Sequence, residues 1–202
     1  MEKGKVFVVS GPSGVGKGTI CSELMRKYPD LAATTVSVTT RKPRPGEVDG
    51  VHYYFRSEEA FDEMLKKGMF LETVDKFTHR YGTLQSEVER VLSDGKNVIL
   101  EIEMIGGVNV KKRMPEAVLI FILPPSLSEL TSRITGRGSE SAEEIRARQE
   151  QVESEFAQAE TYEYFVVNDD LSDAVENLKA IIVAEGLKGD GRVVKENFFG
   201  RK

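Results

Sequence analysis

The sequence predicts an α/β fold in which helices cover both faces of a parallel β-sheet. First, an apolar run at residues 6–10 leads through a glycine-rich turn into a stretch of helical periodicity. Second, three further apolar runs have the length of buried strands and alternate with helical stretches; they lie at residues 98–102, 118–123 and 164–167. Near-continuous apolar strands separated by helices are typical of a parallel sheet buried on both faces.

Helices are expected between these strands, at residues 84–93, 106–113 and 126–135, and the first helix is expected to end near Tyr28. Two segments interrupt the alternation. One mixes alternating, proline-rich and aromatic stretches, which indicates a small mixed insertion; the other is polar and charged, which indicates an excursion from the core. We therefore expect one domain (1–202) with a core at about 1–33, 86–135 and 160–187, the insertion at 34–85, the excursion at 136–159 and a tail at 188–202.

Composition restricts the class of function. The 202 residues include 28 Lys and Arg against 33 Asp and Glu, a net charge of −5, whereas nucleic-acid binders usually carry a basic excess. Cys21 is the only cysteine, so no intrachain disulfide can form, which suits a reducing cytosol. No apolar run has the length of a signal-peptide core or a membrane span. We expect a cytoplasmic protein, monomer or homodimer, with neither nucleic acid nor membrane as a partner.

The strongest motif is a phosphate-binding loop between the first strand and the first helix. It comprises Gly11, Pro12, Ser13, Gly14, Val15, Gly16, Lys17, Gly18 and Thr19. Glycines let the backbone turn tightly and bring its N–H groups against phosphate oxygens, and the following helix N-terminus favours an anion. Lys17 would reach the β- and γ-phosphates of a nucleotide. The motif predicts a P-loop NTPase-type core that binds the phosphates of a nucleotide; the alternative is a glycine-rich turn that only caps a helix.

One position departs from the strict phosphate-loop pattern. The pattern has Ser or Thr after the lysine, where its hydroxyl binds Mg²⁺, whereas this chain has Gly18 followed by Thr19. We therefore expect Mg²⁺ to be held mainly by phosphates and water, with Thr19 as a candidate ligand and no side chain firmly assigned as a metal ligand.

A second basic segment follows at residues 37–55. It carries Arg41 and Arg44 three positions apart and then Tyr53. The planar guanidinium group can hold a phosphate through two parallel hydrogen bonds, and nearby prolines stiffen the segment. Without the phosphate loop, such a segment would more often be solvated surface.

This segment resembles the GMP-binding signature of guanylate kinases, Ser-x-x-Thr-Arg-x-x-Arg-x-Gly-Glu-x-x-Gly-x-x-Tyr, which here runs from Ser37 to Tyr53. Further pieces similar to this family follow in order: Phe-Leu-Glu at 70–72, Arg-Tyr-Gly-Thr at 80–83, Leu-Glu-Ile-Glu-Met-Ile-Gly at 100–106, Phe-Ile-Leu-Pro-Pro-Ser at 121–126, Gly-Arg-Gly at 136–138, Ile-Arg-Ala-Arg at 145–148 and Val-Asn-Asp-Asp at 167–170. The resemblance covers about residues 6–187.

The resemblance implies Mg²⁺-dependent transfer of the γ-phosphoryl group of ATP to GMP, and to dGMP, within purine nucleotide metabolism. It implies GMP-phosphate binding by Arg41, Arg44, Tyr53 and Tyr81, and guanine recognition by Ser37, Glu72 and Thr83, with Glu101 and Glu103 near the base. The chemistry agrees, because guanine offers donors at N1 and N2 whereas a carboxylate only accepts. The alternatives are a surface carboxylate for Glu72 and a helix N-cap for Thr83.

The resemblance also implies a catalytic set of Lys17, Arg41, Arg137 and Arg148. Arg133, Arg137 and Arg148 resemble lid arginines that close over ATP, and Asn168 would lie beside the adenine. Closure of residues 136–159 would exclude water from the reaction. The alternative for these arginines is surface pairing with neighbouring glutamates.

The strand near residue 101 departs from the family pattern, which usually reads Asp/Glu-Ile-Asp followed two residues later by Gln-Gly. Here Glu103 replaces the second Asp and Ile105 replaces the Gln. These departures leave the detailed role of Glu103 open.

Three other functions stay open at this point. A guanylate-kinase-like scaffold domain would bind proteins without catalysis, but such domains typically lose loop residues that are intact here, Gly16 and Lys17. A regulatory P-loop GTPase would need an Asn-Lys-x-Asp guanine reader, which the sequence lacks. A kinase for another small phosphate, such as a ribose phosphate or AMP, is disfavoured by the guanine-reading residues Ser37, Glu72 and Thr83.

Overall fold

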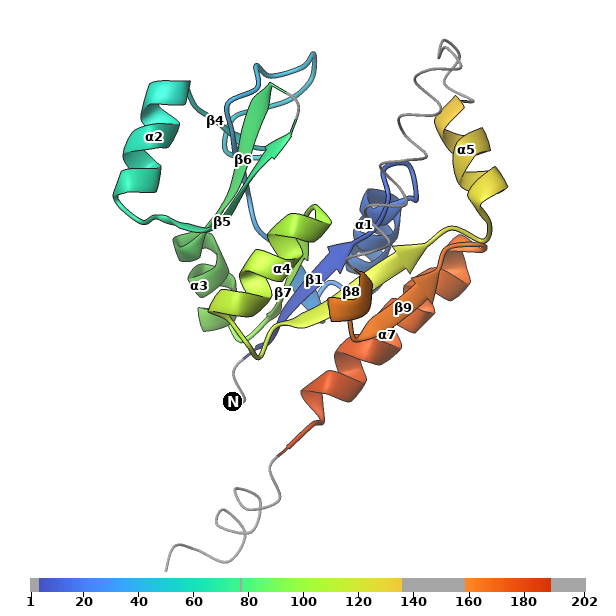
Figure 1. Cartoon of the computed structure of the whole chain (residues 1–202). Helices are drawn as coiled ribbons and strands as arrows, with labels where there is room; N and C mark the ends of the chain where they lie inside the picture. Colours follow the sequence, from blue (N-terminus) through green and yellow to red (C-terminus); the bar gives the residue numbers. More distant parts are fainter. Residues whose placement is uncertain (1–3, 77, 136–158, 190–202) are drawn as a thin grey trace, which may run out of the picture.

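The computed structural model describes residues 4–76, 78–135 and 159–189. They form two lobes, a larger one built on a five-stranded sheet and a smaller one built on a four-stranded sheet (Figure 1). The expected excursion, with Arg137 and Arg148, lies outside the described residues, as does most of the tail. No helix within the described ranges is long and apolar enough to cross a bilayer.

The larger sheet is parallel throughout, which confirms the predicted fold class. Its strand order is β2-β7-β1-β8-β9. The bounds are β1 (Val6–Ser10), β2 (Ala32–Thr34), β7 (Asn97–Glu101), β8 (Val118–Leu123) and β9 (Tyr164–Val167). Val8 in the central strand pairs with Leu100 on one side and Leu119 on the other. The apolar runs therefore became strands within one residue of the predicted positions, with the three-residue β2 added at the edge.

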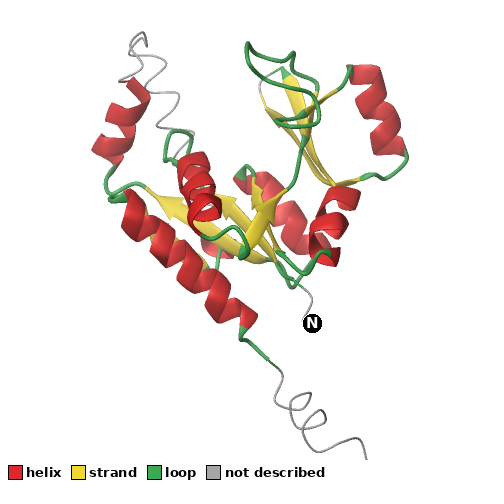
Figure 2. Ribbon diagram, turned by 180° about the vertical axis from the view of Figure 1, so that it is seen from behind, coloured by secondary structure: helices red, strands yellow, loops and turns green. Residues whose placement is uncertain are grey.

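Helices cover both faces of this sheet, as Figure 2 shows from behind. Within the described residues, the helices of this lobe are α1 (Lys17–Lys27), α3 (Gln85–Ser93), α4 (Met104–Arg113), α5 (Leu127–Thr135), the short 3₁₀ helix η1 (Ala159–Thr161) and α7 (Leu171–Gly186). Phe7 and Val9 pack in one buried cluster with residues of α1 and α7, whereas Val6 and Val8 pack in another with residues of α3 and α4. Successive side chains of a strand point to opposite faces, so one strand contributes to both clusters.

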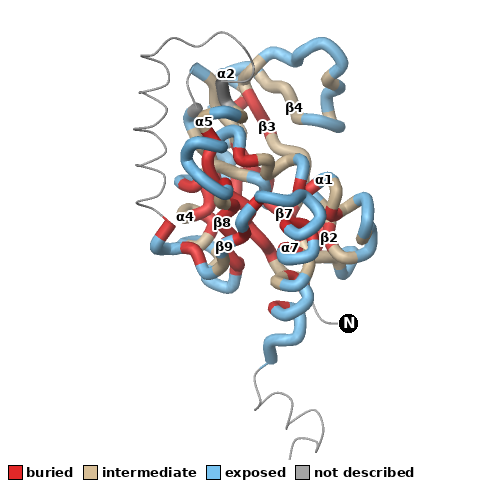
Figure 3. Tube along the Cα trace, turned by 90° about the vertical axis from the view of Figure 1, so that its right-hand side faces the viewer, coloured by how far each residue is buried: buried red, intermediate tan, exposed pale blue. Residues whose placement is uncertain are grey.

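The smaller lobe is a mixed sheet in the order β4-β3-β6-β5, covered by one helix. Its elements are β3 (Val38–Thr39), β4 (Tyr54–Phe55), α2 (Glu58–Lys66), β5 (Phe70–Lys76) and β6 (His79–Leu84). Phe61 of α2 stacks on Phe70 with ring centroids 4.5 Å apart. The helix begins after Ser57, whose side chain accepts a hydrogen bond from the Ala60 N–H. Figure 3 shows buried positions concentrated in the larger sheet and an exposed loop beside β4.

The two lobes are joined by contacts between α4 and β5. The Arg113 guanidinium donates to the Phe70 carbonyl oxygen at 2.7 Å, and the Gln85 amide donates to the same oxygen at 3.2 Å. This carbonyl lies at the start of β5, so both hydrogen bonds fix the strand where it leaves the larger lobe.

Cys21 is a packing residue of the larger core, as predicted. Its side chain is 1% exposed on α1. Burial, together with the negative charge of Glu101, raises the pKa of the thiol to about 12, so it stays protonated and unreactive at neutral pH.

Replacing Leu24, which is 1% exposed in the core between α1 and the sheet, should destabilise the fold. Leu24→Ala should lower the free energy of unfolding by about 2–5 kcal/mol, because the truncation leaves a cavity. Urea unfolding followed by circular dichroism measures this change. The matched control is Leu187→Ala, since Leu187 is 82% exposed and its change should stay within about 0.5 kcal/mol. Equal losses in the two variants would contradict the assigned core.

Candidate active site

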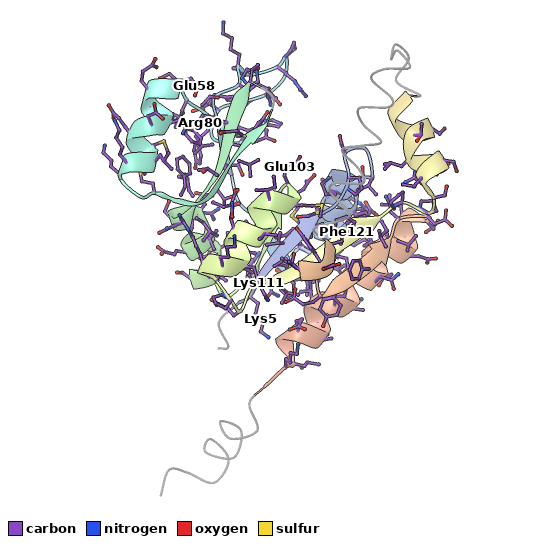
Figure 4. All side chains as sticks on the ribbon, viewed as in Figure 1. Lys5, Glu58, Arg80, Glu103, Lys111 and Phe121 are labelled. Atoms are coloured by element: carbon purple, nitrogen blue, oxygen red, sulfur yellow. The ribbon has the colours of Figure 1, made fainter. Side chains whose placement is uncertain are left out.

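A cavity of about 1000 Å³ opens between the two lobes, where the larger sheet's strands β1, β7 and β9 end. Ligands of open α/β sheets bind beyond the carboxyl ends of the strands, so the position suits a substrate site. Most of the residues predicted to bind nucleotide line this cavity: Ser13, Gly14, Gly16, Lys17, Gly18, Thr19, Ser37, Arg41, Arg44, Tyr53, Glu72, Tyr81, Glu101, Glu103, Arg133 and Asn168. Figure 4 shows Glu103 at the N-terminal end of α4.

Several predicted residues do not line the cavity. Gly11, Pro12 and Val15 are buried within the phosphate loop. Thr83 lies behind the wall, where its hydroxyl contacts Glu72. Sequence reasoning missed other lining residues, among them Val74, His79, Asp169 and Leu171. Of these, only Asp169 carried a signal, as the neighbour of Asn168.

The phosphate loop has the backbone that its glycines predict. Gly14 and Gly16 adopt positive φ angles of 84° and 96°, which side-chain-bearing residues rarely adopt. Gly16 is the N-cap of α1 and offers no capping side chain, so the first N–H groups of the helix stay available for an anion. The Lys17 ammonium donates to the Gly11 carbonyl oxygen at 2.6 Å and to that of Pro12 at 3.1 Å. These two hydrogen bonds hold the positive charge of Lys17 against the phosphate loop.

Gly18 lies against a carboxylate. A Cβ atom at this position would be 3.3 Å from Oε1 of Glu101 and 3.4 Å from Oε2. The chain thus places a carboxylate from the end of β7 beside the position where the strict pattern has a hydroxyl. Thr19 is exposed on the first turn of α1. Within the described residues, no three His, Cys, Asp or Glu side chains gather to form a metal site.

Arg41 on the opposite wall is held by a residue that the sequence reasoning did not single out. Its guanidinium donates to both carboxylate oxygens of Glu47, at 2.8 and 2.9 Å, and lies 5.4 Å from the ring centre of Tyr53. The Glu47 carboxylate raises the pKa of Arg41, and the hydrogen bonds from Arg41 and the Arg44 N–H lower the pKa of Glu47 to about 2. Glu47 stands in the family-like signature, which was its only sequence signal.

Glu72 on β5 is 5% exposed. Its Oε1 accepts a hydrogen bond from the Thr83 hydroxyl at 2.7 Å, whereas Oε2 has no hydrogen-bond partner. Burial raises the pKa of Glu72, and the Thr83 hydrogen bonds oppose that rise only in part. The surface alternative for Glu72 is therefore wrong. The N-cap alternative for Thr83 is also wrong, because the N-cap of α3 is Leu84.

The approach of Glu72 depends on a glycine in α4. A Cβ atom at Gly106 would lie 2.8 Å from Glu72 Oε2. A larger residue would push the carboxylate away from its position in the cavity wall. Ile105, one of the two departures from the family pattern, is 56% exposed and does not line the cavity. Glu103, the other departure, is the N-cap residue of α4 and does line it.

Arg133 on α5 lines the cavity and also contacts a residue outside it. Its Nε donates to Glu129 at 3.0 Å, which is the surface pairing considered as an alternative. Its guanidinium also donates to the main-chain oxygen of Asn168 at 3.1 Å and lines the cavity. Arg133 thus makes a surface pair and still borders the site.

Comparisons with known proteins agree with this geometry. The guanylate kinase family model matches residues 3–185. Guanylate kinase of Caldanaerobacter subterraneus subsp. tengcongensis is 48% identical, over 94% of this chain and 91% of the relative. That of Halalkalibacterium halodurans is 46% identical, over 96% and 95%. The crystal structure of guanylate kinase from Anaplasma phagocytophilum is 28% identical, with a TM-score of 0.77 over 99% of this chain and 97% of that chain. The chain therefore belongs to the guanylate kinase family.

Proposed function

We propose that this chain is an active guanylate kinase that transfers the γ-phosphoryl group of ATP to GMP, and to dGMP, and releases ADP and GDP. One observation carries this proposal: a single cavity holds a formed phosphate loop on one wall and Glu72, with an unpaired buried oxygen, on the other. The first binds a phosphate chain, and the second suits a base that presents hydrogen-bond donors.

On the donor wall, the backbone N–H groups of Gly14 and of residues 16–19 and the Lys17 ammonium would hold the β- and γ-phosphates of ATP. Phosphoryl transfer relies mainly on positioning and on neutralising charge, which these groups supply. Mg²⁺ bound with ATP would add to that neutralisation. The ion would be held mainly by phosphate oxygens and water, and the Glu101 carboxylate and the Thr19 hydroxyl are the candidate protein ligands on the cavity wall.

On the acceptor wall, Arg41, Arg44, Tyr53 and Tyr81 would bind the phosphate of GMP. Glu72 would accept hydrogen bonds from guanine N1 and N2 through its free Oε2, while Thr83 holds Oε1. Adenine has a bare acceptor at N1, so it would leave the carboxylate unpaired. A site built on hydrogen bonds rejects an analogue that lacks them. Ser37 on the same wall is the proposed partner of guanine O6.

The lid remains a proposal from the sequence. Residues 34–85 would form the GMP-binding part, and residues 136–159 would close over ATP and bring Arg137 and Arg148 to the transferring phosphoryl group. Arg133 lies in α5, just before that segment, and borders the cavity. Closure would exclude water and so suppress hydrolysis of ATP.

The activity should be specific for GMP and dependent on Lys17. In a coupled ADP-release assay with ATP and Mg²⁺, GMP should support turnover while AMP, CMP and UMP should not. Lys17→Ala should lower kcat by at least about 10²-fold, because it removes a preorganised charge at the phosphates. The matched control is Lys27→Ala at the far end of α1, where Lys27 pairs with Glu176 on the surface. A folded wild-type chain that binds GMP but releases no ADP would overturn the enzymatic proposal.

Glu72→Gln should lower kcat/KM for GMP by about 10–100-fold, because one charged hydrogen-bond acceptor is lost. In the wild type, kcat/KM for GMP should also fall as the pH drops through the raised pKa of Glu72, since only the carboxylate accepts from both guanine donors. This acid limb should be missing from the Gln variant. Initial rates at low GMP from pH 4.5 to 8 test both points, and an unchanged limb in Glu72→Gln would exclude Glu72 as the titrating group.

The Glu72→Gln substitution should also change how the free energy of unfolding depends on pH. Because the pKa of Glu72 is higher in the folded chain than in the unfolded chain, its contribution to stability is lost as the pH rises through the folded pKa. The wild type should therefore become less stable relative to Glu72→Gln between pH 4 and pH 7 in urea titrations.

The buried Glu185, outside the cavity, provides the control with the opposite sign. Burial alone would raise its pKa, but hydrogen bonds from Lys188 and Tyr164 lower it overall. Its stabilisation is present above the unfolded pKa and is lost as the pH falls through the folded one. Glu185→Gln should therefore be less stable than the wild type at pH 7. The same pH trend for both variants would contradict the two assigned pKa directions.

A further inference from the structure

Asn168 contacts three parts of the donor wall, the side of the cavity that carries the phosphate loop. These parts are the larger sheet, the phosphate loop and Arg133 of α5. Asn168 follows β9 directly, is 7% exposed, and its N–H donates to the Leu123 carbonyl oxygen at 2.8 Å, which extends the pairing of β9 with β8. The main chain of Asn168 is therefore fixed by the sheet.

The side chain of Asn168 is bonded to the phosphate loop. Its Nδ2 donates to the Val15 carbonyl oxygen at 2.7 Å, although the two residues lie 153 positions apart. In a trans peptide the C=O and the following N–H point in opposite directions. Holding the Val15 carbonyl toward Asn168 therefore turns the Gly16 N–H away from Asn168. The hydrogen bond fixes the orientation of one peptide of the loop that lines the cavity.

Gly16 is shaped to receive this amide. A Cβ atom at Gly16 would lie 2.5 Å from Asn168 Nδ2, closer than Cβ atoms approach other heavy atoms. Any side chain at position 16 would thus displace the Asn168 amide, beyond the strain of the positive φ angle. The position of the Asn168 amide therefore depends on a glycine at position 16.

The same residue also holds an arginine of the site. The main-chain oxygen of Asn168 accepts from the Arg133 guanidinium at 3.1 Å. Asn168 therefore fixes a loop peptide with its side chain and a cavity arginine with its main chain.

We infer that Asn168 is a positioning residue for the triphosphate: it orients the phosphate loop through the Val15 carbonyl instead of reading the adenine. The inference rests on the proposed function, because it takes ATP as the ligand of the donor wall. It predicts that Asn168 contributes to binding of any polyphosphate chain, with or without a base.

Inorganic tripolyphosphate separates the two roles, because it carries the phosphate chain without adenine. Asn168→Ala removes the amide without adding charge, and Asn168→Asp keeps the shape but places a carboxylate against the Val15 oxygen. In calorimetric titrations with Mg²⁺, Asn168→Ala should bind ATP and tripolyphosphate about tenfold more weakly, by the same factor for each, and Asn168→Asp at least as weakly. The affinity for GMP and the KM for GMP should stay within about twofold of the wild type.

Asn97→Ala is the matched control. Asn97 also donates from Nδ2 to a loop carbonyl, that of Leu31, at 2.9 Å, but it lies at the start of β7, away from the cavity. Both alanine variants should lose comparable stability in urea, whereas Asn97→Ala should bind tripolyphosphate like the wild type. This comparison separates positioning of the loop from a general loss of structure.

Weaker binding of ATP with unchanged binding of tripolyphosphate would overturn the inference and assign Asn168 to the base. Unchanged binding of both ligands would overturn it as well, as would an equal loss of tripolyphosphate binding in Asn97→Ala. The proposed function fails on a different result, the absence of GMP-dependent ADP release by the wild type. The binding titrations do not depend on turnover, so the two failures are distinguishable.

Discussion

The close approach of the phosphate loop to the ends of β7 and β9 constrains the rest of this structure. The loop leaves the central strand β1 and passes between Glu101 at the end of β7 and Asn168 just after β9. Gly16 and Gly18 leave the space that these two side chains occupy. Because parallel strands end at the same edge of a sheet, both neighbours are supplied by the fold itself. The order of the strands in the sheet therefore determines which side chains lie beside the phosphate loop.

The two buried glutamates of the described residues, Glu72 and Glu185, differ in how their charge is compensated. Glu185 lies far from the cavity and is surrounded by Lys188, Tyr164 and Lys5, which compensate its charge. Glu72 has Thr83 as its one hydrogen-bonding side chain and keeps one oxygen unpaired. A buried, incompletely paired carboxylate destabilises the folded chain, whereas a ligand with matching donors removes that penalty on binding. The proposed recognition of guanine by Glu72 and the local weakness of the fold would then have the same origin.

The sequence predicted the larger sheet well because buried parallel strands are short apolar runs between glycine-rich turns, as β1, β8 and β9 are. The three residues of β2 are too few to form an alternating pattern. The charged composition of α2 made its helical periodicity hard to recognise in the sequence. The cavity lining was largely predictable from motifs. The contacts within it were not: the pairing of Asn168 with Val15 spans 153 positions, and that of Arg41 with Glu47 depends on the path of a loop. Such contacts are set by tertiary structure and leave no local periodicity.

The consecutive glycines of α4 have a consequence for cooperativity. Gly106 makes room for the Glu72 carboxylate from the smaller lobe, and Gly107 lies against Val8 and the Tyr162 hydroxyl in the larger one. Each glycine weakens an isolated helix by about 1 kcal/mol relative to alanine, so this segment has little tendency to be helical alone. The helix therefore exists because both lobes pack against it. We therefore expect local unfolding that starts in either lobe to spread to the other through α4, so that the two sheets unfold together.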